Sequence, residues 1–255
     1  METITKDGLI FSQNGKKLLG SDTELLEELI IPEDTKEIDG NVFSMTQIAS
    51  VKIPDSMDSV SKIAFCSCRY LKDIDFGDGC NKIEEAAFTG CQGLRQVTFP
   101  SQMRIIGKEA FCDCRSFERA NFNEGLALIL QNAFNYCYLL KEVTLPSSLK
   151  CLGDRSIPWA TKITVKGNDL PHNLLRGVTF LGWNNLYDCM DKDIPMTIEV
   201  VFDKKHIFLP RFVDLQKISD AECALNSGMD EYLQTMYKYG TDGTTSAETA
   251  HAMYM

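Results

Sequence analysis

Hydrophobic positions recur along the chain with a period of 23 residues. Five successive units begin at Ile48, Leu71, Leu94, Phe117 and Leu140, and a unit one residue shorter begins at Leu26. A fixed period of this length indicates a solenoid, because each unit can bury its apolar side only by stacking on its neighbours. The repeat therefore predicts the architecture of residues 26–165 before any local propensity is considered.

Two stretches of each unit show the pattern of a strand. Positions 4 and 6, counted from the first apolar residue, are apolar, and this alternation fits a strand with one buried face. A proline often follows at position 7, where its missing N–H ends the strand. Positions 10 and 13 are again apolar and predict a second short strand or an extended side of the coil.

A small residue followed by phenylalanine stands at positions 17 and 18 of five units. These pairs are Val42-Phe43, Ala64-Phe65, Ala87-Phe88, Ala110-Phe111 and Ala133-Phe134. Since the column repeats without interruption, we expect its rings to fill the middle of each turn.

The phrase LxxVxFP followed by xxIxxxAFxxC resembles the BspA-like family of bacterial leucine-rich repeats over residues 26–165. The resemblance implies a leucine-rich-repeat, β-rich solenoid of six units and a last strand. It also implies a role in protein binding, of which a cell-surface adhesin is one form. Ordinary leucine-rich repeats carry Asn or Cys at position 9, whereas these units vary there, so their polar spine must be built differently.

Both ends of the solenoid are expected to be covered. Residues 1–25 contain apolar runs on either side of an Asn14-Gly15 turn and predict a hairpin cap. Residues 166–255 predict a small α+β appendage, with a hairpin over residues 197–211 and a helix after the capping-box pair Ser219 and Glu222. We expect this appendage to pack on the last turn.

The composition is that of a soluble protein with a sizeable core. Of its 255 residues, 44% are hydrophobic and 24% charged, and the net charge is −10. An acidic balance without a basic run disfavours nucleic acid and anionic membrane as partners. The first residues lack the pattern of a secretion signal, so we expect a cytoplasmic protein, or a surface or secreted one if a signal was removed. We also expect a monomer.

Four of the ten cysteines fall in one repeat column, at Cys68, Cys91, Cys114 and Cys137. We expect buried free thiols there, because the column favours a small, weakly polar side chain. Two alternatives remain open. Neighbouring turns about 4.8 Å apart permit a disulfide, and the pairs Cys66/Cys68 and Cys112/Cys114 could form a zinc site.

Catalytic motifs are absent from the sequence. The three histidines, His172, His206 and His251, have no metal-type or nucleophile-type partner at a useful spacing. We therefore expect no cofactor and a non-catalytic interaction scaffold. The alternative is an enzyme or effector whose activity lies in residues 167–255, with the solenoid as its targeting module.

Two groups of residues are candidates for partner binding. Positions 2, 3 and 5 should point outward from the strands, and among them Arg95 and Arg119 are the residues suited to anchor an interface. Tyr136 and Trp159 share position 20 of successive units, with Tyr138 close by. This aromatic cluster either binds a partner or is covered by the C-terminal segment.

Overall fold

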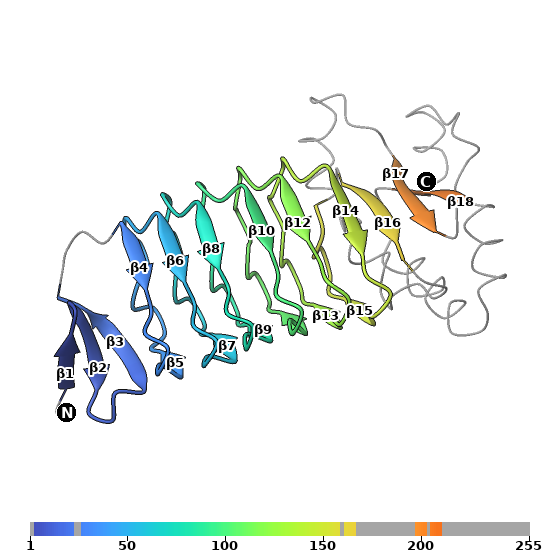
Figure 1. Cartoon of the computed structure of the whole chain (residues 1–255). Helices are drawn as coiled ribbons and strands as arrows, with labels where there is room; N and C mark the ends of the chain where they lie inside the picture. Colours follow the sequence, from blue (N-terminus) through green and yellow to red (C-terminus); the bar gives the residue numbers. More distant parts are fainter. Residues whose placement is uncertain (1–2, 23–26, 159–160, 167–196, 203–204, 211–255) are drawn as a thin grey trace.

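The computed structural model describes residues 3–22, 27–158, 161–166, 197–202 and 205–210. These residues form short strands joined by turns, and no helix occurs among them. The repeat units stack as successive coils, with β1 to β3 at one end and β17 and β18 at the other (Figure 1). The predicted leucine-rich-repeat solenoid is confirmed.

One side of the solenoid carries one strand from each repeat unit, followed by the last strand. These strands run parallel to one another, and we call this surface the strand face. Its strands are β4 (Glu28–Ile30), β6 (Ser50–Lys52), β8 (Asp73–Asp75), β10 (Gln96–Thr98), β12 (Arg119–Asn121), β14 (Glu142–Leu145) and β16 (Lys162–Val165). Each includes the apolar residue of position 4, as the alternation predicts. The hydrogen-bonded ladder is interrupted between β8 and β10 and between β12 and β14.

A second row of two-residue strands runs along another side. It consists of β5 (Glu37–Ile38), β7 (Ser59–Val60), β9 (Lys82–Ile83), β11 (Ile105–Ile106), β13 (Leu128–Ile129) and β15 (Cys151–Leu152). From β7 to β15 these strands form one parallel sheet. Each ends on the buried residue of position 13, which confirms the second strand that the sequence predicts.

The third side is built from turns that contain two residues of positive φ per unit, at positions 16 and 20. Ile63 (φ 59°) and Ser67 (φ 60°) represent them in one unit. Their amides donate to the carbonyls of Glu85 and Thr89 on the next turn. This inter-turn ladder compensates for a conformation that is costly for a β-branched residue such as isoleucine.

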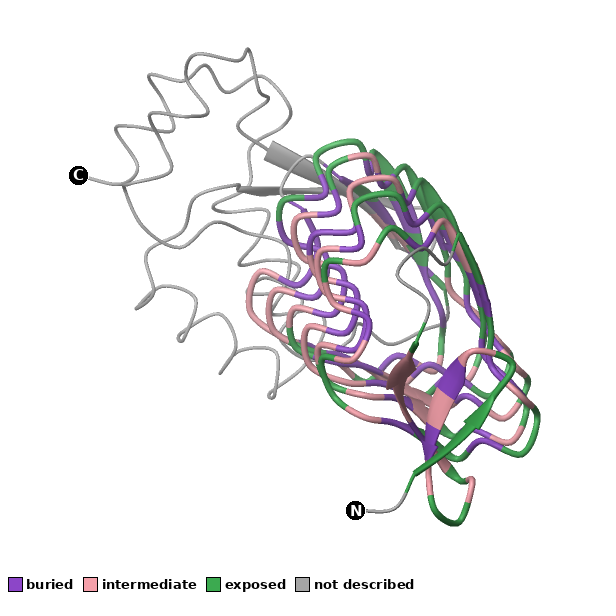
Figure 2. Ribbon diagram, turned by 90° about the vertical axis from the view of Figure 1, so that its left-hand side faces the viewer, coloured by how far each residue is buried: buried purple, intermediate pink, exposed green. Residues whose placement is uncertain are grey.

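The predicted phenylalanine column lies inside the coils, where Figure 2 shows the buried residues in purple. Consecutive rings of Phe43, Phe65, Phe88, Phe111 and Phe134 stack with centroids 5.7, 5.4, 5.3 and 5.4 Å apart. The planes of neighbouring rings differ by less than 10°. One continuous aromatic stack therefore runs through five turns.

The cysteine column supplies the polar spine that position 9 does not. Cys68, Cys91, Cys114 and Cys137 are fully buried free thiols in the structure. Each Sγ donates to a phenylalanine carbonyl of the preceding turn at 3.0 to 3.2 Å. At the end of the column, the hydroxyl of Thr46 bonds the Phe43 carbonyl at 2.7 Å. These five side chains are all small donors, and the predicted burial of the four cysteines is confirmed.

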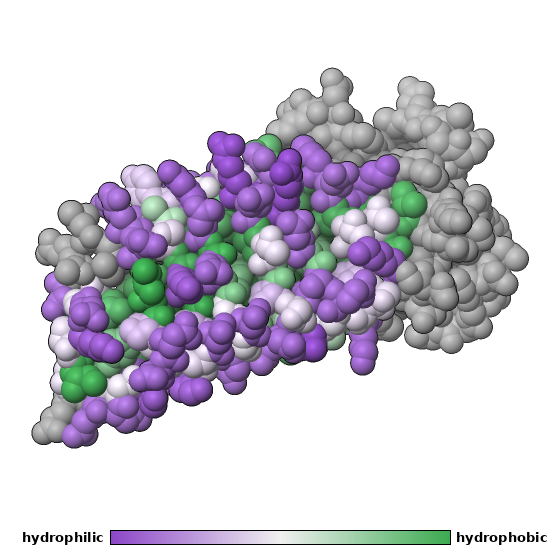
Figure 3. All heavy atoms as spheres, in the orientation of Figure 1, coloured by the Kyte–Doolittle hydropathy of each residue, from purple (hydrophilic) through white to green (hydrophobic). Residues whose placement is uncertain are grey.

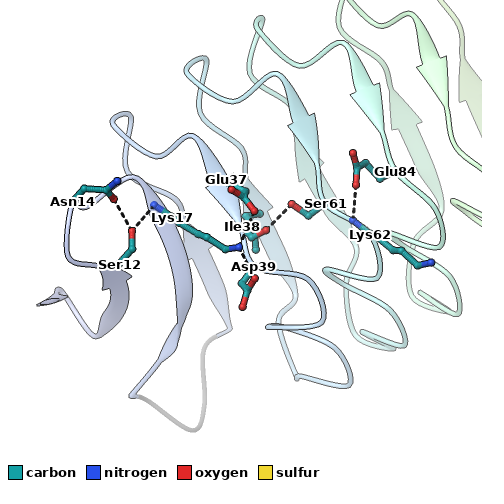
Figure 4. Close-up of polar contacts among 9 residues, drawn as sticks. All are labelled: Ser12, Asn14, Lys17, Glu37, Ile38, Asp39, Ser61, Lys62 and Glu84. Carbon is teal, nitrogen blue, oxygen red and sulfur yellow. Dashed lines mark hydrogen bonds and ion pairs between the residues drawn. The ribbon is translucent and has the colours of Figure 1, made fainter. Parts of the chain in front are cut away.

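The N-terminal strands cap the first turn, as the sequence predicts. β1 (Thr3–Lys6), β2 (Leu9–Ser12) and β3 (Lys17–Ser21) form an antiparallel meander, and β3 pairs in parallel with β5. Figure 4 shows the Lys17 side chain reaching Glu37 and Asp39, at 2.8 and 2.7 Å. Hydrogen bonds to Asp39 and Glu37 raise the pKa of this ammonium group.

At the other end, β17 (Thr197–Phe202) and β18 (Lys205–Pro210) form the predicted antiparallel hairpin. The hairpin extends the strand face, because β17 pairs in parallel with β16. Ile157 occupies the phenylalanine column in the last unit and is buried. The helix expected after Ser219 lies outside the described residues, as does most of the segment proposed to carry an activity of its own.

Candidate interaction surface

The strand face presents polar side chains along its middle turns. Positions 2, 3 and 5 of the four units from Leu71 to Thr144 are all exposed, which confirms their predicted outward orientation. Because they alternate with buried or partly buried residues at positions 4 and 6, substitutions at them leave the core intact. Figure 3, which views the molecule from the side of Figure 1, shows hydrophilic side chains along its upper edge.

A hollow of about 480 Å³ lies on this face across β8, β10 and β12. Its lining residues are Lys72, Asp73, Gly93, Arg95, Gln96, Ser116, Glu118 and Arg119. It therefore brings together Arg95 and Arg119, which the sequence singled out separately. It also spans the place where the ladder between β8 and β10 is interrupted.

Position 23, the last of each unit, explains where the hollow forms. This position holds Gly93 and Ser116 in the two middle units, but Tyr70 before them and Leu139 after them. Tyr70 and Leu139 are exposed. A Cβ on Gly93 would lie 2.9 Å from the carbonyl oxygens of Arg69 and Leu71, so the backbone there leaves no room for a side chain.

The charges of the hollow are only partly paired. Arg95 lies 3.7 Å from Glu118, and its side chain is 75% exposed, which makes this a weak surface ion pair. Among the described residues, neither Lys72 nor Arg119 has an acidic partner at ion-pair distance. Three cations thus face solvent on adjacent turns of an acidic protein.

The aromatic candidates form a second, smaller patch. Tyr136 and Tyr138 are both exposed, and their rings meet edge to face with centroids 6.0 Å apart. Tyr136 has a φ of 64°, an uncommon conformation for a bulky residue. Trp159 lies outside the described residues, so its predicted stacking on Tyr136 stays a prediction.

Two of the cysteines, Cys80 and Cys112, are poor nucleophiles. Burial raises the pKa of the Cys80 thiol to about 12, and burial, with a smaller effect of the nearby Glu109 carboxylate, raises that of Cys112 to about 12. Both thiols are protonated at neutral pH, whereas nucleophilic attack requires the thiolate. In the described part of the chain, no three His, Cys, Asp or Glu side chains converge to hold a metal, the pairs considered for zinc included.

The repeat of this chain matches the profile of a known protein family. The family profile described as the BspA type leucine rich repeat region matches residues 21–88 and 58–165, in six copies. Together these matches cover more than half of the chain. The chain belongs to the BspA-type leucine-rich repeat family. A search of curated proteins found no match to this BspA-type chain.

Solved structures share the fold of this BspA-type chain. The leucine-rich repeat protein of T. pallidum has a TM-score of 0.56 and 24% identity, over 63% of this chain and 78% of that one. A cell surface protein of Faecalibacterium prausnitzii has a TM-score of 0.50 and 18% identity, over 68% and 56%. The pneumococcal vaccine antigen PcpA has a TM-score of 0.52 and 22% identity, over 65% and 50%. The matched region spans about half of these last two chains.

Where the structure describes the chain, it contains no helix long and apolar enough to cross a membrane.

Proposed function

We propose that the protein is a non-catalytic scaffold that binds a protein partner through its strand face, with the hollow around Arg95 and Arg119 at the centre of the contact. The observation that carries this proposal is that one hollow gathers both arginines on a surface of exposed side chains. Arginine is enriched among the residues that dominate interface energies. The stacked coils beneath the face set the spacing of the strands that carry these side chains, and such a preformed surface lowers the entropic cost of binding.

The Tyr136 and Tyr138 patch is the proposed second contact. Exposed tyrosines supply contact area at low conformational cost and keep a hydroxyl for hydrogen bonding. The two rings already support one another in the edge-to-face arrangement. A partner that spans several turns would reach both regions.

The test compares two variants of equal net charge. The strand-face variant carries Arg95→Gln and Arg119→Gln, and the control carries Lys16→Gln and Lys150→Gln, which are exposed and lie outside the strand face. Proteins captured by the immobilised whole chain are identified by mass spectrometry, and the affinity of each is then measured. The proposal expects a partner that the control retains and the strand-face variant loses. Equal binding of every captured partner to both variants would overturn it.

The finer proposal is display at a cell surface in an adhesin-like role. One structural neighbour is described as a cell surface protein. Labelling of intact producing cells with an antibody against the solenoid tests this role. Labelling only after the cells are lysed would contradict it and favour the cytoplasmic location.

A further inference from the structure

The hollow on the strand face has features that select the chemistry of its ligand. Its cations stand one per turn on three consecutive turns, as Lys72, Arg95 and Arg119. At about 4.8 Å per turn, they cover about 10 Å along the solenoid. This length matches a few residues of an extended peptide, which rises about 3.3 Å per residue.

The charge of the hollow differs from that of the protein. The whole chain has a net charge of −10, while the hollow has three cations and two carboxylates, a balance of +1. Because Lys72 and Arg119 have no acidic partner at ion-pair distance among the described residues, an incoming carboxylate need not displace an existing ion pair from them. Arginine offers two parallel N–H donors that fit a carboxylate.

The two acids of the hollow restrict the ligand further. Asp73 and Glu118 would repel a densely charged polyanion such as a sulfated glycan or a nucleic acid. Gln96 and Ser116 provide uncharged groups that can bond a peptide backbone. A ligand with separated single carboxylates on a neutral backbone satisfies both conditions.

We propose that the hollow lined by Lys72, Arg95 and Arg119 binds an acidic peptide segment of the partner, with an Asp or Glu carboxylate of that segment held between the two arginines. This inference rests on the proposed function, because it names the partner chemistry for the same face. Gly93 and Ser116 leave room for the segment, because neither extends a long side chain into the hollow that both line.

The experiment selects short random-sequence peptides from a display library on the immobilised whole chain. The same selection is run on the strand-face variant (Arg95→Gln with Arg119→Gln) and on the control (Lys16→Gln with Lys150→Gln). The expected result is enrichment of Asp and Glu in the peptides selected by the wild type and the control, and loss of this enrichment with the strand-face variant. In a synthetic copy of the best peptide, exchanging its critical Glu for Gln should weaken binding about tenfold or more, the effect of losing a charge-assisted hydrogen bond.

Three results would overturn the inference. They are the absence of any enriched peptide, enrichment without an acidic bias, and tighter binding of heparin or inorganic phosphate than of any selected peptide. These failures are separable from failure of the proposed function. A captured protein partner lost with the strand-face variant would still support the interface, even if its bound segment carried no acid.

Discussion

The aromatic stack predicts that a phenylalanine in the middle of the solenoid stabilises it more than one at the end. The perturbation is Phe111→Leu, compared with Phe43→Leu. Both side chains are buried, with exposures of 0% and 2%, so leucine loses a similar amount of apolar burial at either site. A swap between hydrophobic residues of similar size usually costs less than about 1.5 kcal/mol by itself. The difference between the variants therefore isolates the ring contacts.

The number of ring partners sets the magnitude. The Phe111 ring meets those of Phe88, Phe99, Phe117 and Phe134 at 5.3 to 5.8 Å, whereas Phe43 meets only Phe65 among the described residues. An aromatic pair contributes about 0.5 to 1.5 kcal/mol beyond its burial. Three additional pairs at the lower limit give about 1.5 kcal/mol, which we take as the expected difference in the free energy of unfolding.

Urea denaturation of the whole chain, followed by circular dichroism, measures this difference. With a slope of about 3 kcal/mol per M, the midpoint for Phe111→Leu should lie about 0.5 M below that for Phe43→Leu. Repeat arrays can unfold from one end, so the assay needs a check of cooperativity. Unfolding is cooperative if hydrogen exchange of the central turns follows the same transition as circular dichroism. Equal midpoints for the two variants, or a lower one for Phe43→Leu, would refute the reasoning.

Three further predictions concern the turns and the thiols. Gly90→Ala should cost about 1 kcal/mol, because Gly90 has a φ of 73°, whereas Gly20→Ala, with open space around it, should be near neutral in the same urea assay. The Cys114→Thr variant should be more stable than the Cys114→Val variant by about 1 kcal/mol. Threonine and valine have the same shape, but only threonine keeps a donor for the buried carbonyl. Burial raises the pKa of Cys80 and Cys112 from 9.0 to about 12, so the stability that they contribute is complete below pH 9 and is lost as pH rises toward 12. Urea midpoints across that range should fall, and a flat profile would contradict the prediction.

Much of the fold could be predicted because a repeat displays each structural requirement several times. The alternation at positions 4 and 6 predicted the strand face, and the phenylalanine column predicted the ring stack. The residues of positive φ were missed, because their columns contain Ile63, Glu109 and Tyr136, which do not favour that conformation. The inter-turn ladder overrides their local preference, although Gly90 at position 20 and Asn41 and Asn132 at position 16 were signals for it.

The role of the cysteine column was predicted only in part. Its burial followed from the recurrence of a small residue, but the bond from each Sγ to a carbonyl of the preceding turn depends on how successive coils superimpose. Thr46 at the end of the column hinted at a donor, because threonine and cysteine share a small side chain with a polar hydrogen.

The Asp7-Gly8 turn between β1 and β2 was also missed, although Asp-Gly is a strong hairpin signal.

The candidate site shows what a repeat conceals when its residues are considered one unit at a time. Arg95 and Arg119 stand at different positions, 2 and 3, of consecutive units, so no single column contains both. They share the hollow because the coils keep register and because position 23 is small in the same two units. A solenoid can thus acquire a binding site by two outward substitutions that leave the phenylalanine and cysteine columns unchanged. It follows that replacing Ser116 with a larger residue should weaken partner binding. The core, and with it the free energy of unfolding of the solenoid, should stay unchanged.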